Sequence, residues 1–322
     1  MDVERVALDT ASFALHLMHM IVCILAFLIN LLLFYLLTKY TVFHHHMKMI
    51  MINLTLAVLA SVFYLLIRSS LGVYQIYHKN PMAPTNEPRE DVDCAFSETV
   101  PRSICLLFFA FPMCLVIERS IASRRFWDYE NENLSGGVGA VCFVLWIPTS
   151  IDILGFLMQF SLPDSLETCQ YSMLKKTFLQ RNIMFIIVAF FCLIFTIMFR
   201  LLEKENRNSE ADYVANHYTT LSVRFQIREN VKTCRFAVSL NLLLFVAFLV
   251  FFLFDQNLSD SDLNEHSAAK REYLFFVFPV FATIYAILFI ASHPQLINKT
   301  KRTFQNLTSS FTQYHEQEKM LS

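Results

Sequence analysis

The chain has 322 residues, a formal net charge of −1 and 55% hydrophobic residues, but only 16% charged residues. Soluble domains usually carry about 25% charged residues, so this composition excludes an ordinary soluble domain. The chain has only five glycines, and it contains no HExxH or GxSxG motif and no pair of carboxylates within one apolar run. We therefore expect neither an enzyme nor a cofactor, and no nucleic-acid partner.

Seven apolar runs follow one another along the chain. Each is about 20 residues long, which is enough for a helix to cross a bilayer core of about 30 Å. The runs predict an all-α membrane protein with one domain over residues 1–322, a seven-transmembrane helix bundle with a tail at 293–322. An odd number of spans places the two chain ends on opposite sides of the membrane. The predicted spans are 15–37, 48–67, 103–121, 137–158, 182–202, 236–254 and 274–292.

The loops on the two sides of the membrane differ in charge. The set that includes the N-terminal segment holds ten Lys and Arg and fifteen acidic residues, whereas the set that includes the C-terminal tail holds sixteen and eleven. An excess of Lys and Arg marks the cytoplasmic side of a multi-pass protein. We therefore expect a plasma-membrane protein with its N-terminus outside and its C-terminus inside.

Cysteines and glycosylation motifs fit this orientation. Of the eight cysteines, Cys94 and Cys169 fall in the proposed outer loops. An oxidising exterior would join such a pair in a disulfide, although two unpaired thiols are the alternative. Asn257 is the one Asn-x-Ser/Thr motif that would face outward, so it is the expected glycosylation site.

The third span ends in the charged pair Glu118 and Arg119. In one interpretation the arginine only anchors the helix at the headgroups. In the other it is a switch, restrained by the neighbouring carboxylate at rest and released to contact an intracellular partner. The 25 residues from Cys94 to Arg119 span about 37 Å as a helix, which is about one membrane crossing and favours the switch.

A second basic feature precedes the sixth span. Arg224, Arg228 and Lys232 are spaced at i, i+4 and i+8, so on a helix they form one stripe. The stripe could lie on anionic lipid headgroups, at about 1 kcal/mol for each basic residue. It could also dock an acidic partner, and the two interpretations are compatible.

The motif Ile-Glu-Arg-x-x-Ala-Ser at 117–123, with Asp-Tyr-Glu at 128–130, is followed by Leu-Ser-x-Arg-Phe-Gln-x-x-Glu-Asn at 221–230. This order resembles the nematode serpentine chemoreceptors of class epsilon (the Sre family), whose relatives are the alpha and beta classes. The resemblance implies a receptor of chemosensory neurons, in their sensory cilia, that binds a small molecule and signals through a heterotrimeric G protein. It implies these coupling residues: Glu118, Arg119, Asp128, Tyr129, Glu130, Arg224, Phe225, Gln226, Glu229 and Asn230. One departure is His45 and His46, where the family often has Asn.

The ligand site is less well marked. Asp152 lies in the outer half of the fourth span, where it is either a counter-ion for a cationic ligand or, more commonly, a structural residue. Arg102 could meet an anionic ligand or anchor the third span at the headgroups. Aromatic residues crowd the outer halves of the last two spans, where lipid-facing rings are the default and an apolar pocket is the alternative. Those rings are Phe248, Phe251, Phe252, Phe254, Phe275, Phe276 and Phe278.

Histidines do not predict a metal site. His16 and His19 share one face of the first span, and two histidines alone do not coordinate a metal. The run His44–His46 is expected at the headgroups. A seven-span ligand-gated channel or transporter remains the alternative function, but it predicts several charged pore-lining residues or matching halves. The sequence shows neither feature.

Overall fold

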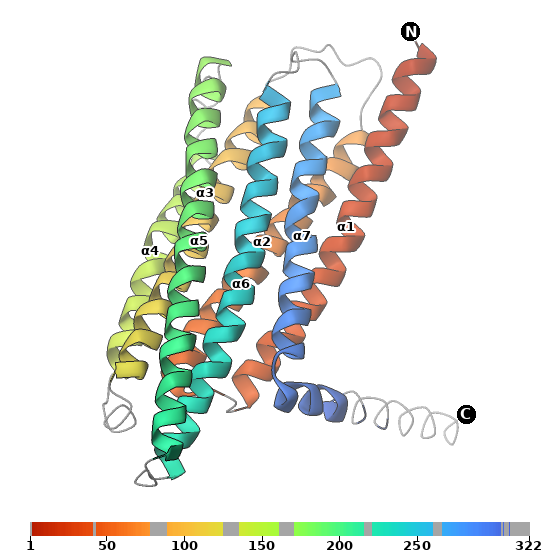
Figure 1. The fold of residues 1–322 in the computed structure, drawn as a ribbon. Coiled ribbons are helices and arrows are strands. Elements are labelled where there is room, and N and C mark those ends of the chain that lie inside the picture. The colour runs from red at the N-terminus through yellow and green to blue at the C-terminus, as the bar shows by residue number, and fades with distance from the viewer. Residues whose placement is uncertain are drawn as a thin grey trace, which may run out of the picture.

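A computed structural model contains seven long helices and, in the part of the chain that it describes, no strand (Figure 1). It describes residues 2–40, 43–77, 89–124, 135–160, 171–215, 221–259 and 266–303, together with 305 and 309. The all-helical prediction is confirmed for these residues. The helices are α1 (Asp2–Lys39), α2 (His45–Tyr77), α3 (Arg89–Arg124), α4 (Ser135–Phe160), α5 (Tyr171–Ala215), α6 (Leu221–Ser259) and α7 (His266–Ala291).

The helices are longer than the apolar runs that predicted them. Six of the seven runs lie wholly within one helix, and the run 274–292 passes the end of α7 by one residue. Among the described residues, five helices are long and apolar enough to cross a membrane, and α7 with the short helix Pro294–Thr303 makes a sixth. In α4 the described apolar stretch is shorter, at Gly137–Ser150.

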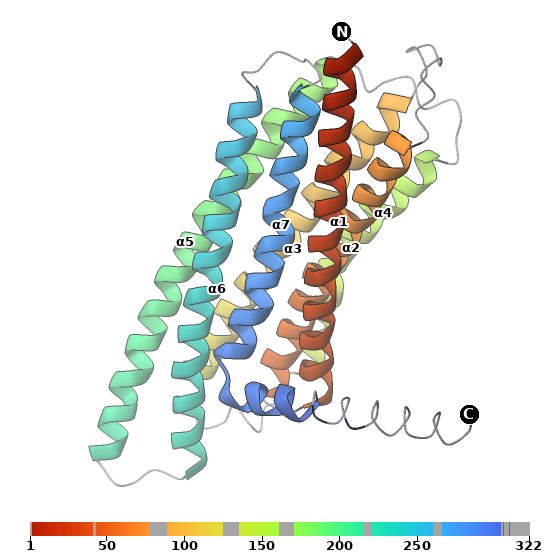
Figure 2. The same cartoon turned by 90° about the vertical axis from the view of Figure 1, so that its right-hand side faces the viewer.

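The seven helices lie side by side, with the N-terminal end of α1 and the C-terminal end of α7 at opposite ends of the bundle (Figure 1). The most extensive contact joins α5 and α6, and the next joins α1 and α2. α3 contacts α2, α4, α5 and α6, so it occupies the middle of the bundle. α5 and α6 project beyond the other helices at the end where α7 finishes (Figure 2).

Polar side chains join helices inside the apolar bundle. The Nδ2 group of Asn30 in α1 donates to the carbonyl oxygen of Ala282 in α7 over 2.9 Å. The hydroxyls of Thr55 in α2 and Tyr285 in α7 lie 3.0 Å apart, and both residues are fully buried. Lipid tails offer no hydrogen-bond partner, so such contacts help to fix which helices are neighbours.

The chain turns sharply after α7. The helix Pro294–Thr303, which we call the turned helix, makes an angle of 104° with α7. Pro294 has no backbone N–H to donate to α7, which favours a break at this point. Leu296 is buried, and the Lys299 ammonium lies 4.7 Å from the centroid of the Tyr40 ring in the α1–α2 link. We call this end of the bundle the turned-helix end.

Candidate functional site: a buried arginine network

Arg119, near the C-terminal end of α3, is buried despite its charge, with 1% of its surface exposed. Its Nε and Nη2 groups donate to the two carboxylate oxygens of the neighbouring Glu118, which is 5% exposed. Removing one partner from a buried ion pair costs about 3–5 kcal/mol, because the other charge is left uncompensated. The end of α3 therefore holds a charge that is stable only while its local partner stays in place.

Asn230 connects this pair to α6. The Nη1 group of Arg119 donates to Oδ1 of Asn230 over 2.8 Å, and Asn230 is 4% exposed. A hydrogen bond to a charged group contributes about 1.5–3 kcal/mol. Because Glu118 is on the same helix as Arg119 while Asn230 is on another, separation of α3 and α6 breaks the Asn230 contact and spares the ion pair.

Two further contacts bring the start of α2 and the end of α7 to this network. The backbone N–H of His44, just before α2, donates to Oε1 of Glu229 in α6 over 3.2 Å. The ring of Phe43 packs edge-on against the ring of His293 at 4.6 Å between centroids, and Phe236 in α6 packs on the same histidine at 5.4 Å. The ends of four helices therefore meet around a set of polar and aromatic contacts.

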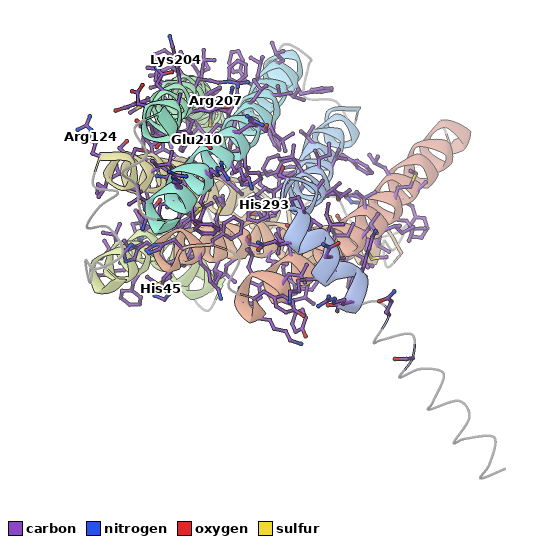
Figure 3. All side chains as sticks on the ribbon, turned by 60° about the horizontal axis from the view of Figure 1, so that its bottom comes forward. His45, Arg124, Lys204, Arg207, Glu210 and His293 are labelled. Atoms are coloured by element: carbon purple, nitrogen blue, oxygen red, sulfur yellow. The ribbon has the colours of Figure 1, made fainter. Side chains whose placement is uncertain are left out.

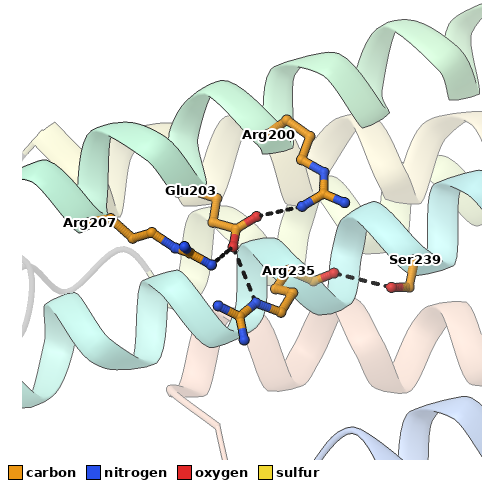
Figure 4. Close-up of polar contacts among 5 residues, drawn as sticks. All are labelled: Arg200, Glu203, Arg207, Arg235 and Ser239. Atoms are coloured by element: carbon orange, nitrogen blue, oxygen red, sulfur yellow. Dashed lines mark hydrogen bonds and ion pairs between the residues drawn. The ribbon is translucent and has the colours of Figure 1, made fainter.

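Glu203 clamps α5 to α6 next to the network (Figure 4). One carboxylate oxygen accepts from Arg207 at 2.6 Å and from Arg235 at 3.2 Å, and the other accepts from Arg200 at 3.1 Å. Glu203 itself is 4% exposed, whereas the three arginine side chains are more than half exposed. The sequence did not single out Glu203, because three arginines on two helices surround it only after α5 and α6 have packed together.

The predicted basic stripe lies on α6. Arg228 pairs with Glu210 in α5 at 2.7 Å, and its side chain is 62% exposed. Phe225, in the same turn, is 64% exposed, and Lys232 is exposed one turn later. The stripe, with Arg224 at its start, therefore combines charge with an exposed aromatic ring.

Further basic side chains surround the turned-helix end. Seen from this end, the side chains of Arg124 of α3 and of Lys204 and Arg207 of α5 point outward from the bundle (Figure 3). Arg124 and Lys204 are exposed. With the stripe on α6, cationic groups from α3, α5 and α6 therefore lie at the end of the bundle that holds the buried Arg119.

An aromatic cluster fills the middle of the bundle. Phe108 of α3 is fully buried, and its ring lies 6.3 Å from Phe248, 5.4 Å from Phe278 and 5.9 Å from Phe281. Phe248 and Phe251 are 2% and 6% exposed, so the lipid-facing default is wrong for both. It does hold for Phe254, which is 47% exposed. Phe248 and Phe251 are three residues apart, so they lie on one face of α6, and this face meets the bundle.

Comparison with known protein families agrees with this architecture. The family model described as serpentine type 7TM GPCR receptor class ab chemoreceptor matches residues 6–320. The chain belongs to this family. No curated protein matches the sequence. The match covers nearly the whole of this class ab receptor. The class epsilon that the sequence motifs suggested is not confirmed.

Some of the predicted site residues of this class ab receptor fall outside the described structure. Of the coupling and disulfide residues, four lie outside the described residues: Asp128, Tyr129, Glu130 and Cys169. Four others lie in helices whose backbone is described, but their side chains are outside the described part: Cys94, Arg102, Asp152 and Asn257. The disulfide, the glycosylation site and the two ligand contacts therefore stay predictions.

The opposite end of the receptor holds polar contacts that the sequence did not indicate. His19 in α1 is fully buried, and its Nδ1 atom lies 2.9 Å from the hydroxyl of Ser69 in α2. The Arg68 guanidinium lies 3.8 Å from the centroid of the Phe275 ring in α7, within range of a cation–π contact. The pairing of Arg68 with an aromatic ring depends on the packing of α2 against α7, which no local sequence pattern reveals.

A groove of about 410 Å³ opens between α2 and α4 of the receptor. Its lining includes Phe143, which is 71% exposed, and Trp146, whose Nε1 group donates to Oδ1 of Asn53 over 2.9 Å. This bond joins Asn53 of α2 to α4 at the groove. The groove is open and mostly apolar, and none of its lining residues belongs to the Arg119 network.

Proposed function

We propose that this chain is a chemosensory receptor that binds a small-molecule ligand from outside the cell and activates a heterotrimeric G protein. Membership of a family of 7TM GPCR chemoreceptors supports this activity. The observation that carries the site is the buried Arg119, held by Glu118 on its own helix and by Asn230 on α6. This arrangement is suited to a contact that one helix movement opens.

In this mechanism the ligand shifts an existing equilibrium between two packings of the bundle. In the resting packing, Arg119 binds Asn230 and the ends of α3 and α6 stay together. In the active packing the ends separate, the Asn230 contact breaks, and the G protein contacts the turned-helix end. The partner-facing groups proposed for this surface are Asp128, Tyr129, Glu130, Arg224, Phe225, Gln226, Arg228 and Glu229.

The proposed orientation has the N-terminus outside and the turned-helix end in the cytoplasm of a plasma-membrane receptor, by resemblance in sensory cilia. The excess of Lys and Arg in the loops at the turned-helix end supports it. Epitope tags at the two chain ends test it in cells: antibody should reach the N-terminal tag without permeabilisation and the C-terminal tag only after it. Staining of the C-terminal tag on intact cells would contradict the orientation.

The ligand class is proposed from the outer half of the bundle. A ligand bound there would meet Asp152 or Arg102 if it is charged, and the aromatic cluster around Phe108 if it is apolar. Because Phe108 contacts rings from α6 and α7, displacement of this cluster supplies a physical route from the ligand to α6.

Nucleotide exchange tests the function directly. The receptor in lipid nanodiscs should accelerate exchange on a purified heterotrimeric G protein, basally or with an odorant mixture. Arg119→Ala should abolish this acceleration, because the residue proposed to meet the partner is gone. Surface expression and thermal unfolding serve as controls for folding. Full exchange by a correctly folded Arg119→Ala receptor would disprove the switch, and no exchange with any G protein would argue against coupling.

A further inference from the structure

Three potential metal ligands converge where α2 begins and α3 ends. The ligand atoms of His44, His46 and Glu118 all lie within 4.8 Å of one another. His46 and Glu118 are buried, at 4% and 5% exposure, and His44 is half-buried. The set joins two positions of one short segment to a third position more than 70 residues away, so it exists only in the folded protein.

The local structure explains the convergence. α2 begins at His45, so His44 precedes the first turn and His46 lies within it. The rings of His44 and His46 approach edge-on, with their centroids 4.9 Å apart. The backbone N–H of His44 is fixed by Glu229 on α6. His45 between them is exposed, so it offers a matched histidine outside the set.

The donor set matches one class of ion. Two imidazole nitrogens and one carboxylate oxygen are ligands that zinc accepts, commonly with a fourth position open to water or another group. Imidazole also suits copper and nickel, whereas calcium and magnesium prefer all-oxygen sites. Ligands around one tetrahedral zinc lie about 3.3 Å apart, since each is about 2.0–2.2 Å from the metal. Small side-chain rotations would therefore close the set around an ion.

We propose that His44, His46 and Glu118 form a site for a divalent transition-metal ion, with Zn²⁺ as the physiological occupant. The site ties α2 to α3 at the turned-helix end. It also shares Glu118 with Arg119, whose guanidinium binds both oxygens of that carboxylate. A bound cation draws charge from the carboxylate and weakens its hold on Arg119. Metal binding does not depend on the proposed G-protein coupling, whereas its effect on signalling does.

Zinc titration of the full-length receptor tests the site. The receptor is purified without a polyhistidine tag, placed in nanodiscs and dialysed against buffered Zn²⁺. Wild type should bind one Zn²⁺ per receptor that the variants of the proposed site do not bind. His44→Ala and His46→Ala should each weaken binding by more than the roughly 10- to 100-fold typical of an outer-shell change. His45→Ala, one residue away from each ligand, should leave binding unchanged.

Other outcomes overturn the proposal. No bound zinc in wild type, equal loss in His45→Ala, or full binding by the double variant of His44 and His46 would each show a hydrogen-bonded polar cluster without a metal. Thermal unfolding shows whether each variant is folded. If replacement of buried His46 unfolds the receptor, His44→Ala decides the test, because His44 is half-buried and precedes the helix. The visible ligand-field absorption of Co²⁺ bound to the same receptor gives a second readout. The absorption bands of Co²⁺ at this site must disappear in His44→Ala.

The effect on signalling is measured separately. Zn²⁺ should raise basal nucleotide exchange in wild type, because it loosens Arg119, and should have no effect on His44→Ala. Unchanged exchange in wild type would reject the link to Arg119 while the titration still decides the metal site. Absence of exchange under every condition would count against the proposed coupling and would leave the binding result intact.

Discussion

Replacing Asn230 with Ala removes the contact between α3 and α6 without touching the ion pair on α3. The lost bond joins Arg119 Nη1 to Asn230 Oδ1 over 2.8 Å, and both residues are at least 96% buried. A hydrogen bond to a charged group contributes about 1.5–3 kcal/mol. At about 1.4 kcal/mol for each factor of ten, the equilibrium between the two packings should shift roughly 10- to 100-fold toward separated helix ends.

The assay is basal nucleotide exchange on a G protein at equal amounts of folded receptor in nanodiscs. Asn230→Ala should raise basal exchange, since the resting packing alone contains the bond. Asn241→Ala is the matched control: Asn241 is fully buried on the same helix, but its Nδ2 group donates to the Ala237 carbonyl within α6. Unchanged or reduced exchange by folded Asn230→Ala, or an equal rise in Asn241→Ala, would refute the role given to this contact.

Three further predictions concern stability. Glu203→Gln weakens three ion pairs, each worth about 0.2–1 kcal/mol because the arginines are more than half exposed; the melting temperature should fall at low salt and less at high salt, and exposed Glu205→Gln should have no effect. Burial lowers the pKa of His293, so below about pH 6.5 the unfolded chain binds a proton that the folded chain does not, and the free energy of unfolding should decrease as the pH is lowered. If His293→Gln lost stability in acid to the same extent as wild type, this histidine would be excluded as the source. Tyr285→Phe removes the contact with Thr55 and should cost about 0.6 kcal/mol in thermal or denaturant unfolding; a loss several times larger would mean that the ring has shifted.

Hydropathy predicted the helices well but their lengths poorly. The run 182–202 predicted about half of α5, which spans Tyr171–Ala215. The remainder is polar, so a membrane-based criterion does not detect it. These polar turns are helical because α5 and α6 pair with each other beyond the apolar region, through contacts such as Arg228 with Glu210. Pairing between helices distant in sequence leaves no periodic signal in either one.

The contacts at the turned-helix end were predicted in part. The adjacent residues Glu118 and Arg119 could be interpreted together because a local pair needs no tertiary information. Asn230 entered only through a family resemblance, and its bond to Arg119 is visible only in the structure. The His44–His46 run was expected at the headgroups because its carboxylate neighbour, Glu118, comes from a different helix.

The Glu203 clamp has a mechanical consequence. Residues 203–215 of α5 and the start of α6 extend about 20 Å past the apolar run. Arg235 of α6 pairs with Glu203 of α5, and Arg228 of α6 pairs with Glu210 of α5, so these segments should move together and not as two independent rods. If the helices tilt by about 10° around a point near the bundle centre, about 30 Å from their tips, the tips move by roughly 5 Å. The clamp thus lets a small rearrangement deep in the membrane become a large displacement at the protein's edge.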